Sequence, residues 1–335
     1  MTTSNNKVLV TGATGFLGRR TVEMLVERGF QVRALVRTPS KASSLAYLDL
    51  EIAQGDVADS DSLKPAFEGI DYVVHAAADT SGTIEGARRV TIGGTKNILD
   101  LCCSHQIQKL VYISSCSVYC PADYKDREVV DEDAPLEKYP ERRGIYSWAK
   151  SEAEKIVLDY MKKNKISAVC LRPGTIYGPG GENYSPMMGF AFKNKIFAVI
   201  HNNKLLNLIY VDDLVQAIIA GMVQDKSTGQ IYNVVDTHQV SKKEYINGFI
   251  RNLYPEAWIV YMPYSILSAA VGLQEMAFKA LGINPFLTKY RLISSQRPII
   301  YASSKIKSHL DWQPSFSFGQ AVEMIVAHEK AKKEK

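Results

Sequence analysis

At 335 residues the chain is long enough to bury a large core, and this length favours one large domain with a smaller lobe. Its 46% hydrophobic and 22% charged residues are typical of a soluble globular protein. The formal net charge of +5 comes partly from the lysine-rich segment 330–335, which we interpret as a solvated tail. No basic cluster is interleaved with aromatic residues, which disfavours a nucleic-acid partner.

The cysteine and hydropathy patterns narrow the class further. The five cysteines form neither a CxxC pair nor a Cys/His metal spacing, so we expect no metal site. An odd number of thiols without a signal peptide favours a reducing cytoplasm. No apolar run is long enough to span a membrane. The nearest, 264–281, predicts an amphipathic helix that packs on the core or forms a lid, with contact to a membrane surface as the alternative.

In chain order, the first half of the sequence alternates strand and helix patterns. The predicted strands are 7–11, 31–36, 51–53, 72–76, 109–114 and 168–172, and the predicted helices are 19–28, 60–67, 91–105 and 146–164. Near-continuous apolar strands separated by helices predict an α/β fold in which a doubly wound parallel sheet is covered on both faces.

The pattern loosens after Gly174, where we predict a smaller lobe. We assign residues 1–176, 208–236 and 301–330 to the main domain. Residues 177–207 and 237–300 form a mostly helical lobe over the carboxyl ends of the strands, and 254–298 is expected to be helical and apolar.

A glycine-rich loop joins the first strand to the first helix. Glycines let a pyrophosphate approach the backbone, and the following helix presents free N–H groups to the phosphates. The position of the loop predicts a dinucleotide site. The residues expected to contact the dinucleotide here are Gly12, Thr14, Gly15, Phe16, Leu17 and Gly18.

The end of the second strand predicts which dinucleotide binds. An NAD-preferring enzyme usually has an acid there for the ribose 2′-hydroxyl, whereas this chain has Val36 followed by Arg37, which suits a 2′-phosphate. NADP(H) is therefore favoured, and NAD(H) stays possible. Asp56 and Val57 are expected at the adenine. Three small residues after the fourth strand let the cofactor lie against the backbone: Ala76, Ala77 and Ala78.

Tyr146 and Lys150 lie one helical turn apart on one face of a predicted helix. An ammonium about 4 Å from a phenol contributes about 4 kcal/mol at an effective dielectric of about 20, enough to bring the phenol pKa towards neutral. Such a phenol suits general acid/base catalysis. The same spacing recurs at Tyr301–Lys305, but only Tyr146 follows a strand that ends in serines, at 114 and 115.

Six motifs in order resemble the extended short-chain dehydrogenases/reductases, the NAD-dependent epimerase/dehydratase family, over essentially the whole chain. They are TGATGFLG at 11–18, HAAA at 75–78, VYISSCSVY at 111–119, YSWAK at 146–150, LRPGTIYGPG at 171–180 and YVDDL at 210–214. The resemblance implies a Rossmann domain, a catalytic triad of Ser115, Tyr146 and Lys150, and a homodimer paired through helices 91–105 and 146–164. It also places Pro173 and Ile176 near the nicotinamide, and Tyr146 and Lys150 at the cofactor as well. Thr91 departs from the family, which often has asparagine there.

The motifs also discriminate between reactions. Cys116-Ser117 stand where nucleotide-sugar 4,6-dehydratases of this family carry Asp-Glu, which disfavours dehydration. Cys116 resembles the epimerising cysteine of the GDP-fucose synthase branch, but the loop after Tyr177 lacks the expected histidine. We interpret Cys116 as a buried structural residue.

The C-terminal third resembles the 3β-hydroxysteroid dehydrogenase and dihydroflavonol reductase branch, through 284–288, 301–305 and 310–314. The sequence thus predicts an NADP(H)-preferring alcohol/ketone oxidoreductase for an apolar small-molecule substrate. A nucleotide-sugar epimerase or reductase is the alternative, and a cofactor-binding regulator without activity is a third reading that the intact triad disfavours.

Overall fold

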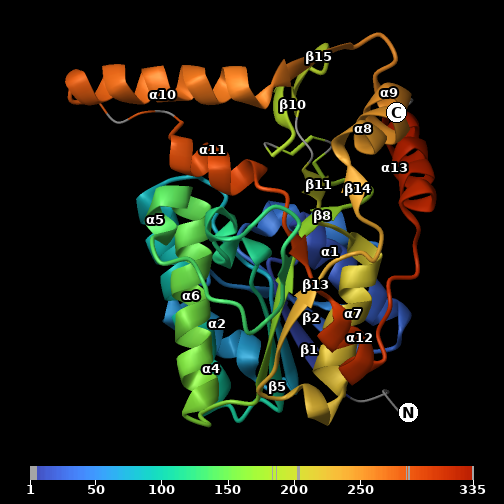
Figure 1. Ribbon diagram of the computed structural model, residues 1–335. Helices are drawn as coiled ribbons and strands as arrows, with labels where there is room; N and C mark the ends of the chain where they lie inside the picture. Colours follow the sequence, from blue (N-terminus) through green and yellow to red (C-terminus); the bar gives the residue numbers. More distant parts are fainter. Residues whose placement is uncertain are drawn as a thin grey trace.

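The computed structural model describes residues 6–182, 184–185, 187–201, 204–283, 285 and 287–333. Its centre is a parallel sheet of seven strands in the order β13-β7-β5-β4-β1-β2-β3 (Figure 1). The order reverses beside β1, as in a doubly wound fold. The strands are β1 (Lys7–Thr11), β2 (Gln31–Val36), β3 (Glu51–Gln54), β4 (Tyr72–His75), β5 (Lys109–Ile113), β7 (Ala168–Pro173) and β13 (Ile231–Val234).

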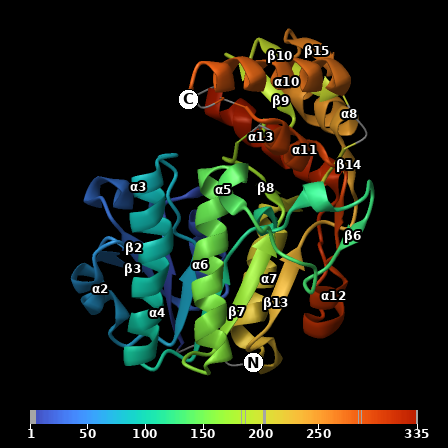
Figure 2. The same cartoon turned by 60° about the vertical axis from the view of Figure 1, so that its left-hand side comes forward.

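Helices cover both faces of this sheet, because its central strands are apolar on both sides. One core lies under α1 and α7, and the other lies under α2, α4 and α6, which Figure 2 shows side by side. The helices are α1 (Phe16–Glu27), α2 (Ser60–Phe67), α4 (Gly94–Ser104), α6 (Ile145–Lys162), α7 (Val211–Val223) and α12 (Ser304–Leu310).

The predicted strands and helices of the first half are present with ends shifted by at most a few residues. In the largest change, the helix predicted at 91–105 begins earlier and has two parts. A π-helical turn, η2 (Ala87–Gly93), precedes α4. Shorter elements complete this part: η1 (Pro39–Leu45), α3 (Ile84–Gly86), η3 (Cys116–Val118), η4 (Pro121–Asp123), β6 (Val129–Val130), α5 (Pro140–Arg143), β8 (Thr175–Tyr177), β12 (Leu208–Tyr210), η5 (Asp225–Ser227) and β16 (Ile300–Tyr301).

A smaller lobe sits above one end of the sheet (Figure 2), and it contains more strand than predicted. A three-stranded sheet crosses it in the order β15-β10-β9: β9 (Gly189–Phe192), β10 (Ile196–His201) and β15 (Trp258–Pro263). The expectation of an all-helical 254–298 is therefore wrong at β15, where side chains alternate between the two faces of a sheet. The other elements are β11 (Leu205–Leu206), β14 (Val240–Ser241), α8 (Lys242–Tyr245), η6 (Ile246–Ile250), α9 (Arg251–Leu253), α10 (Tyr264–Ala280) and α11 (Lys289–Gln296).

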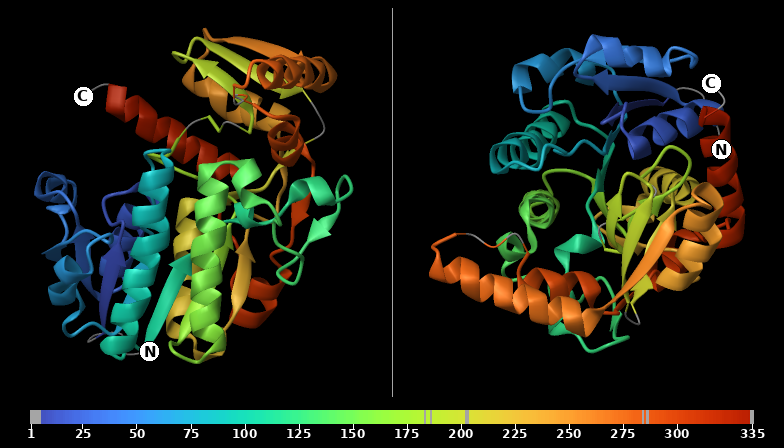
Figure 3. Two further views of the ribbon diagram at one scale, coloured as in Figure 1. Left: turned by 90° about the vertical axis from the view of Figure 1, so that its left-hand side faces the viewer. Right: turned by 90° about the horizontal axis from the view of Figure 1, so that it is seen from above.

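Two helices near the C-terminus differ from expectation. Helix α10 projects from the lobe (Figure 3, right), and Val271 is its one fully buried residue, so it is not a core helix. The lysine-rich segment expected to be a tail is instead helical as far as Lys333, at the end of α13 (Phe318–Lys333). Glu334 and Lys335 lie outside the described residues, as do Asn284 and Phe286 of the 284–288 motif.

Candidate active site

The glycine loop packs so tightly that side chains are excluded at two positions. Gly12 has a φ of +69°, and a Cβ there would lie 2.9 Å from the backbone nitrogen of Ala77. At Gly18, a Cβ would lie 2.0 Å from the Gly12 carbonyl oxygen. Helix α1 starts at Phe16 with no side-chain cap, so its first N–H groups are free to face an anion.

A cleft runs from this loop along the ends of β2, β3 and β4. The predicted cofactor residues that line it are Gly12, Thr14, Gly15, Phe16, Leu17, Gly18, Arg37, Asp56, Val57, Ala76, Ala77 and Ala78. Asp56 is ordered by its Oδ1, which accepts a hydrogen bond from the Ala58 backbone at 3.0 Å. This cleft fits the pyrophosphate and adenosine of a dinucleotide. Its glycines and alanines leave the backbone accessible, the N-terminus of α1 is uncapped, and a cation lies at one end.

Sequence reasoning missed some residues of this cleft. Thr38 and Lys41 line it next to Arg37, where the chain passes from β2 into η1. The sequence does carry a signal for Lys41, because it is a second basic residue only four positions after Arg37. Pro173 and Ile176, expected near the nicotinamide, are not among the cleft-lining residues. They lie at the end of β7 and in β8.

The structure brings Ser115 and Tyr146 together. Ser115 follows β5, and its hydroxyl accepts a hydrogen bond from the Ser117 backbone at 3.1 Å. Tyr146 is in the first turn of α6, which begins after Gly144, and 53% of its surface is exposed. Desolvation by the surrounding protein raises the pKa of the Tyr146 phenol, while its hydrogen bond with Ser115 opposes that rise. The two hydroxyls thus form one unit beyond the carboxyl end of β5.

Lys150 does not act on Tyr146 as the sequence analysis expected. Its ammonium donates a 2.7 Å hydrogen bond to the Ile113 carbonyl and lies 5.5 Å from the centre of the Tyr112 ring. The side chain is buried, and this burial lowers the Lys150 pKa to about 8. The predicted lowering of the Tyr146 pKa by Lys150 is therefore wrong, because the ammonium is held against the strand.

The neighbouring Ser114 has a different, structural role. Its hydroxyl donates to Glu154 of α6, and Glu154 forms a fully buried ion pair with Arg172 of β7, with 2.6 Å between the Arg172 Nη2 and Glu154 Oε1 atoms. Arg172 also donates to the Tyr119 hydroxyl at 2.6 Å. This network ties β5, β7 and α6 together, which leaves Ser115 as the serine available to a substrate.

A second buried network lies behind the cleft. His75 contacts the Thr11 hydroxyl through Nδ1 at 2.7 Å and the Thr95 hydroxyl through Nε2 at 3.1 Å. Desolvation lowers its pKa to about 3, so this histidine is neutral and structural. Thr91, which replaces the family's asparagine, accepts from the Asp79 backbone at 2.8 Å.

Cys116 and Tyr301 are both structural. The Cys116 thiol is buried, donates to the Arg172 carbonyl at 3.2 Å, and has a pKa far above the usual range because of desolvation. Tyr301 of the second YxxxK pair donates to the Cys116 carbonyl at 3.1 Å and stacks on Tyr119. Within the described residues, no group of three His, Cys, Asp or Glu side chains could hold a metal, and no helix could cross a membrane.

A doubly wound sheet with a dinucleotide cleft, and a serine–tyrosine hydroxyl pair beside a buried lysine, define an enzyme of the short-chain dehydrogenase/reductase class. A model described as the NAD dependent epimerase/dehydratase family matches residues 8–234. The chain belongs to that family and is an extended member related to the 3β-hydroxysteroid dehydrogenases.

Curated relatives span nearly the whole chain. A 3 beta-hydroxysteroid dehydrogenase/Delta 5-->4-isomerase of Mycobacterium tuberculosis is 30% identical, over 96% of this chain and 90% of its own. A 3beta-hydroxysteroid-dehydrogenase/decarboxylase of Arabidopsis thaliana is 26% identical, with coverage of 95% and 78%. A 4-hydroxy-2-methyl-3-oxo-4-farnesyl-3,4-dihydroquinoline-1-oxide ketoreductase of Stigmatella aurantiaca is 28% identical, with coverage of 82% and 81%.

Solved structures share the fold. The protein gox2253 superposes with a TM-score of 0.80 at 25% identity, over 97% of this chain and 99% of its own. MoeE5, solved in complex with UDP-glucose and NAD, gives a TM-score of 0.74 at 20% identity, with coverage of 98% and 100%. At that identity the second likeness concerns the fold alone.

Proposed function

We propose that this chain is an NADP(H)-preferring oxidoreductase that interconverts an apolar ketone and its alcohol. The observation that carries the proposal is the hydroxyl pair of Ser115 and Tyr146 after β5, the strand next to β4 whose end lines the dinucleotide cleft, with Lys150 buried one turn further along α6. The nicotinamide, when bound, supplies or accepts the hydride.

Three residues of the chain bind the substrate and cofactor and transfer the proton. Ser115 donates a hydrogen bond to the substrate carbonyl and holds it near the phenol. Tyr146 gives its proton to the carbonyl oxygen during reduction, or removes the hydroxyl proton during oxidation. Lys150 is positioned to hold the cofactor ribose, since its ammonium already lies at the end of β5. These three residues are our proposed catalytic residues.

The preference for NADP(H) rests on the charges at the adenosine end. Arg37 and Lys41 both line the cleft there, and β2 ends in Val36 instead of an acid. A 2′-phosphate would be paired with these cations. NADP+ should therefore raise the melting temperature more than NAD+ does, and Arg37→Ala should remove the difference. Equal shifts, or a larger one with NAD+, would overturn this preference.

The apolar substrate is supported by the relatives, whose names refer to steroids and to a farnesylated quinoline. One observation favours the alternative of a nucleotide sugar. A cavity in the lobe is lined by five basic side chains among apolar ones. The five are Arg127, His201, Lys204, Lys242 and Lys243. Burial lowers the pKa of Lys204 to about 8 and that of Lys242 to about 7, so Arg127 and Lys243 are the lining cations that suit a diphosphate.

The test is cofactor turnover with a panel of steroid ketones, long-chain ketones and nucleotide sugars. We expect turnover of apolar ketones that Tyr146→Phe abolishes, while the affinity for NADP(H) is kept. Turnover of nucleotide sugars alone would overturn the substrate class and favour the epimerase. No turnover with any member, despite cofactor binding, would favour a regulator.

A further inference from the structure

The side of helix α10 that faces solvent is apolar, which reverses the usual pattern of a surface helix. Its exposed positions follow helical spacing, and Leu273 and Met276 are 68% and 71% exposed. The apolar residues of this stripe are Ile266, Ala269, Ala270, Leu273, Met276, Ala277 and Ala280. The opposite side is the one that packs, through Leu267 and Val271, against the lobe. Large exposed apolar surfaces of this kind mark sites that contact a membrane or a partner protein.

The lobe sheet extends this surface. Helix α10 covers the sheet near Ile200. Because side chains alternate, Ala198 and Ile196 of β10 point to the same face as Ile200. In register with Ile196 lie Trp258, 76% exposed, and Phe192, both at the uncovered end of that face. Val260 and Phe190, in register with Ala198, are also exposed.

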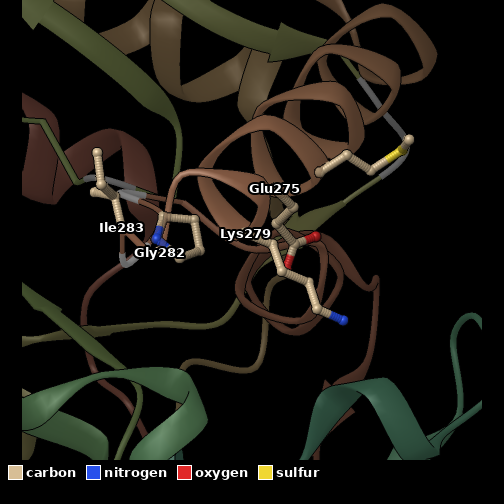
Figure 4. Close-up of a pocket in the computed structure, with 6 residues that line it drawn as sticks. Glu275, Lys279, Gly282 and Ile283 are labelled. Atoms are coloured by element: carbon tan, nitrogen blue, oxygen red, sulfur yellow. The ribbon is translucent and has the colours of Figure 1, made fainter.

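Lysines border these apolar residues. Lys193 and Lys195 are at the tip of the β9–β10 hairpin, and the Lys193 ammonium lies 5.7 Å from the centre of the Phe192 ring. Lys279 shares one side of α10 with Glu275 (Figure 4). Lys289 crosses the same helix at Gly272, where its Cε lies 2.4 Å from where a glycine Cβ would be.

We propose that α10 and the open face of the β9–β10–β15 sheet dock on an anionic phospholipid surface. An interfacial helix places its apolar stripe below the headgroups, with lysines at headgroup level and tryptophan at the boundary. The segments 189–201 and 258–296, which form this surface, carry these four lysines and a single acid, Glu275, which already accepts a hydrogen bond from the Lys289 backbone at 3.0 Å. This excess of positive charge favours anionic lipid over a second copy of the same basic surface. The inference is independent of the substrate proposed above.

The test is co-sedimentation of the full chain with vesicles of phosphatidylcholine, with and without phosphatidylserine. Leu273→Glu and Met276→Glu change exposed positions and should leave the fold intact, which thermal melting checks. Each should weaken binding to the phosphatidylserine vesicles by about tenfold or more. The matched control is Ile84→Glu, equally apolar and 54% exposed but on α3 of the main domain, which should bind like the wild type.

Trp258 gives a second readout, because burial in lipid shifts its fluorescence to the blue. We expect this shift with phosphatidylserine vesicles, and its loss in Trp258→Phe. The proposal is overturned if the wild type stays in the supernatant, if neutral vesicles bind it equally well, or if Leu273→Glu and Ile84→Glu behave alike. A wild-type dimer that Leu273→Glu dissociates, without vesicle binding, would assign the surface to a second copy instead.

Discussion

Tyr146 and Lys150 share one face of α6, but about half of Tyr146 is exposed, whereas Lys150 is buried against β5. Because the pKa of Tyr146 is raised, its phenol stays protonated at neutral pH. Ketone reduction needs the protonated form, so its kcat/KM should hold through neutral pH and fall as pH rises through that pKa. Alcohol oxidation needs the phenolate and should rise over the same range. Initial rates in both directions across pH check this.

The matched control is Ser115→Ala, which keeps the phenol but removes the hydrogen bond that lowers its pKa. The pH dependence of reduction and that of oxidation should then both move to higher pH, and both rates should fall. If the pH dependence of both rates were unchanged, Ser115 would not act on the pKa of the phenol. The family resemblance predicts which hydroxyls meet here, because Ser115 lies four residues before Tyr119, whereas the strand alone offers Ser114 and Ser115 equally. The sequence could not predict that Lys150 binds the Ile113 carbonyl, since this depends on side-chain packing.

At the scale of elements, the loop between β1 and α1 is the tightest part of the cofactor cleft. Gly18→Ala would place a methyl group 2.0 Å from the Gly12 carbonyl. We expect a loss of about 1–3 kcal/mol in the free energy of unfolding, from backbone shifts, together with weaker cofactor binding. Gly319→Ala is the control, because Gly319 of α13 has open space around it. Equal melting temperatures and equal cofactor affinities for the two variants would contradict this packing.

The contact of α6 with β7 rests on the buried pair of Glu154 and Arg172. Glu154→Gln leaves the guanidinium without its counter-charge in the core. It should lower the free energy of unfolding by about 3–5 kcal/mol, measured by urea denaturation. In Glu152→Gln the loss should be below about 1 kcal/mol, since the pair with Lys155 is exposed. If the first variant were as stable as the second, the pair would not hold these elements together.

The central strands could be predicted from the sequence, whereas the strands of the lobe could not. The seven central strands are readable because each is a short apolar run between helices with clear periodicity. The strands of the lobe are not readable in this way. Strands β9 and β15 are only four and six residues long, and aromatic side chains of both lie on the open face, so apolar and polar residues do not alternate clearly. For helix α10 the sequence favours packing on the core or a lid and leaves contact with a membrane surface as the alternative, because an apolar stripe predicts burial and does not say against what.

For the whole molecule, the resemblance-based homodimer remains a prediction. It would pair the outer sides of α4 and α6, which carry exposed ion pairs such as Lys96–Asp100 and Lys155–Glu152. An interface of this composition should weaken with salt. Light scattering should give a dimer at low ionic strength and a larger monomer fraction at high salt. A monomer under both conditions would contradict the pairing.

The proposed reaction is hydride exchange with a carbonyl carbon, assisted by the Tyr146 proton. It is tested with NADPH that carries deuterium at both C4 positions of the nicotinamide, an apolar ketone, and mass spectrometry of the product. We predict one deuterium on the carbinol carbon with the wild-type chain, and none with Tyr146→Phe at the same cofactor occupancy. An unlabelled product, or equal labelling by the variant, would contradict this reaction.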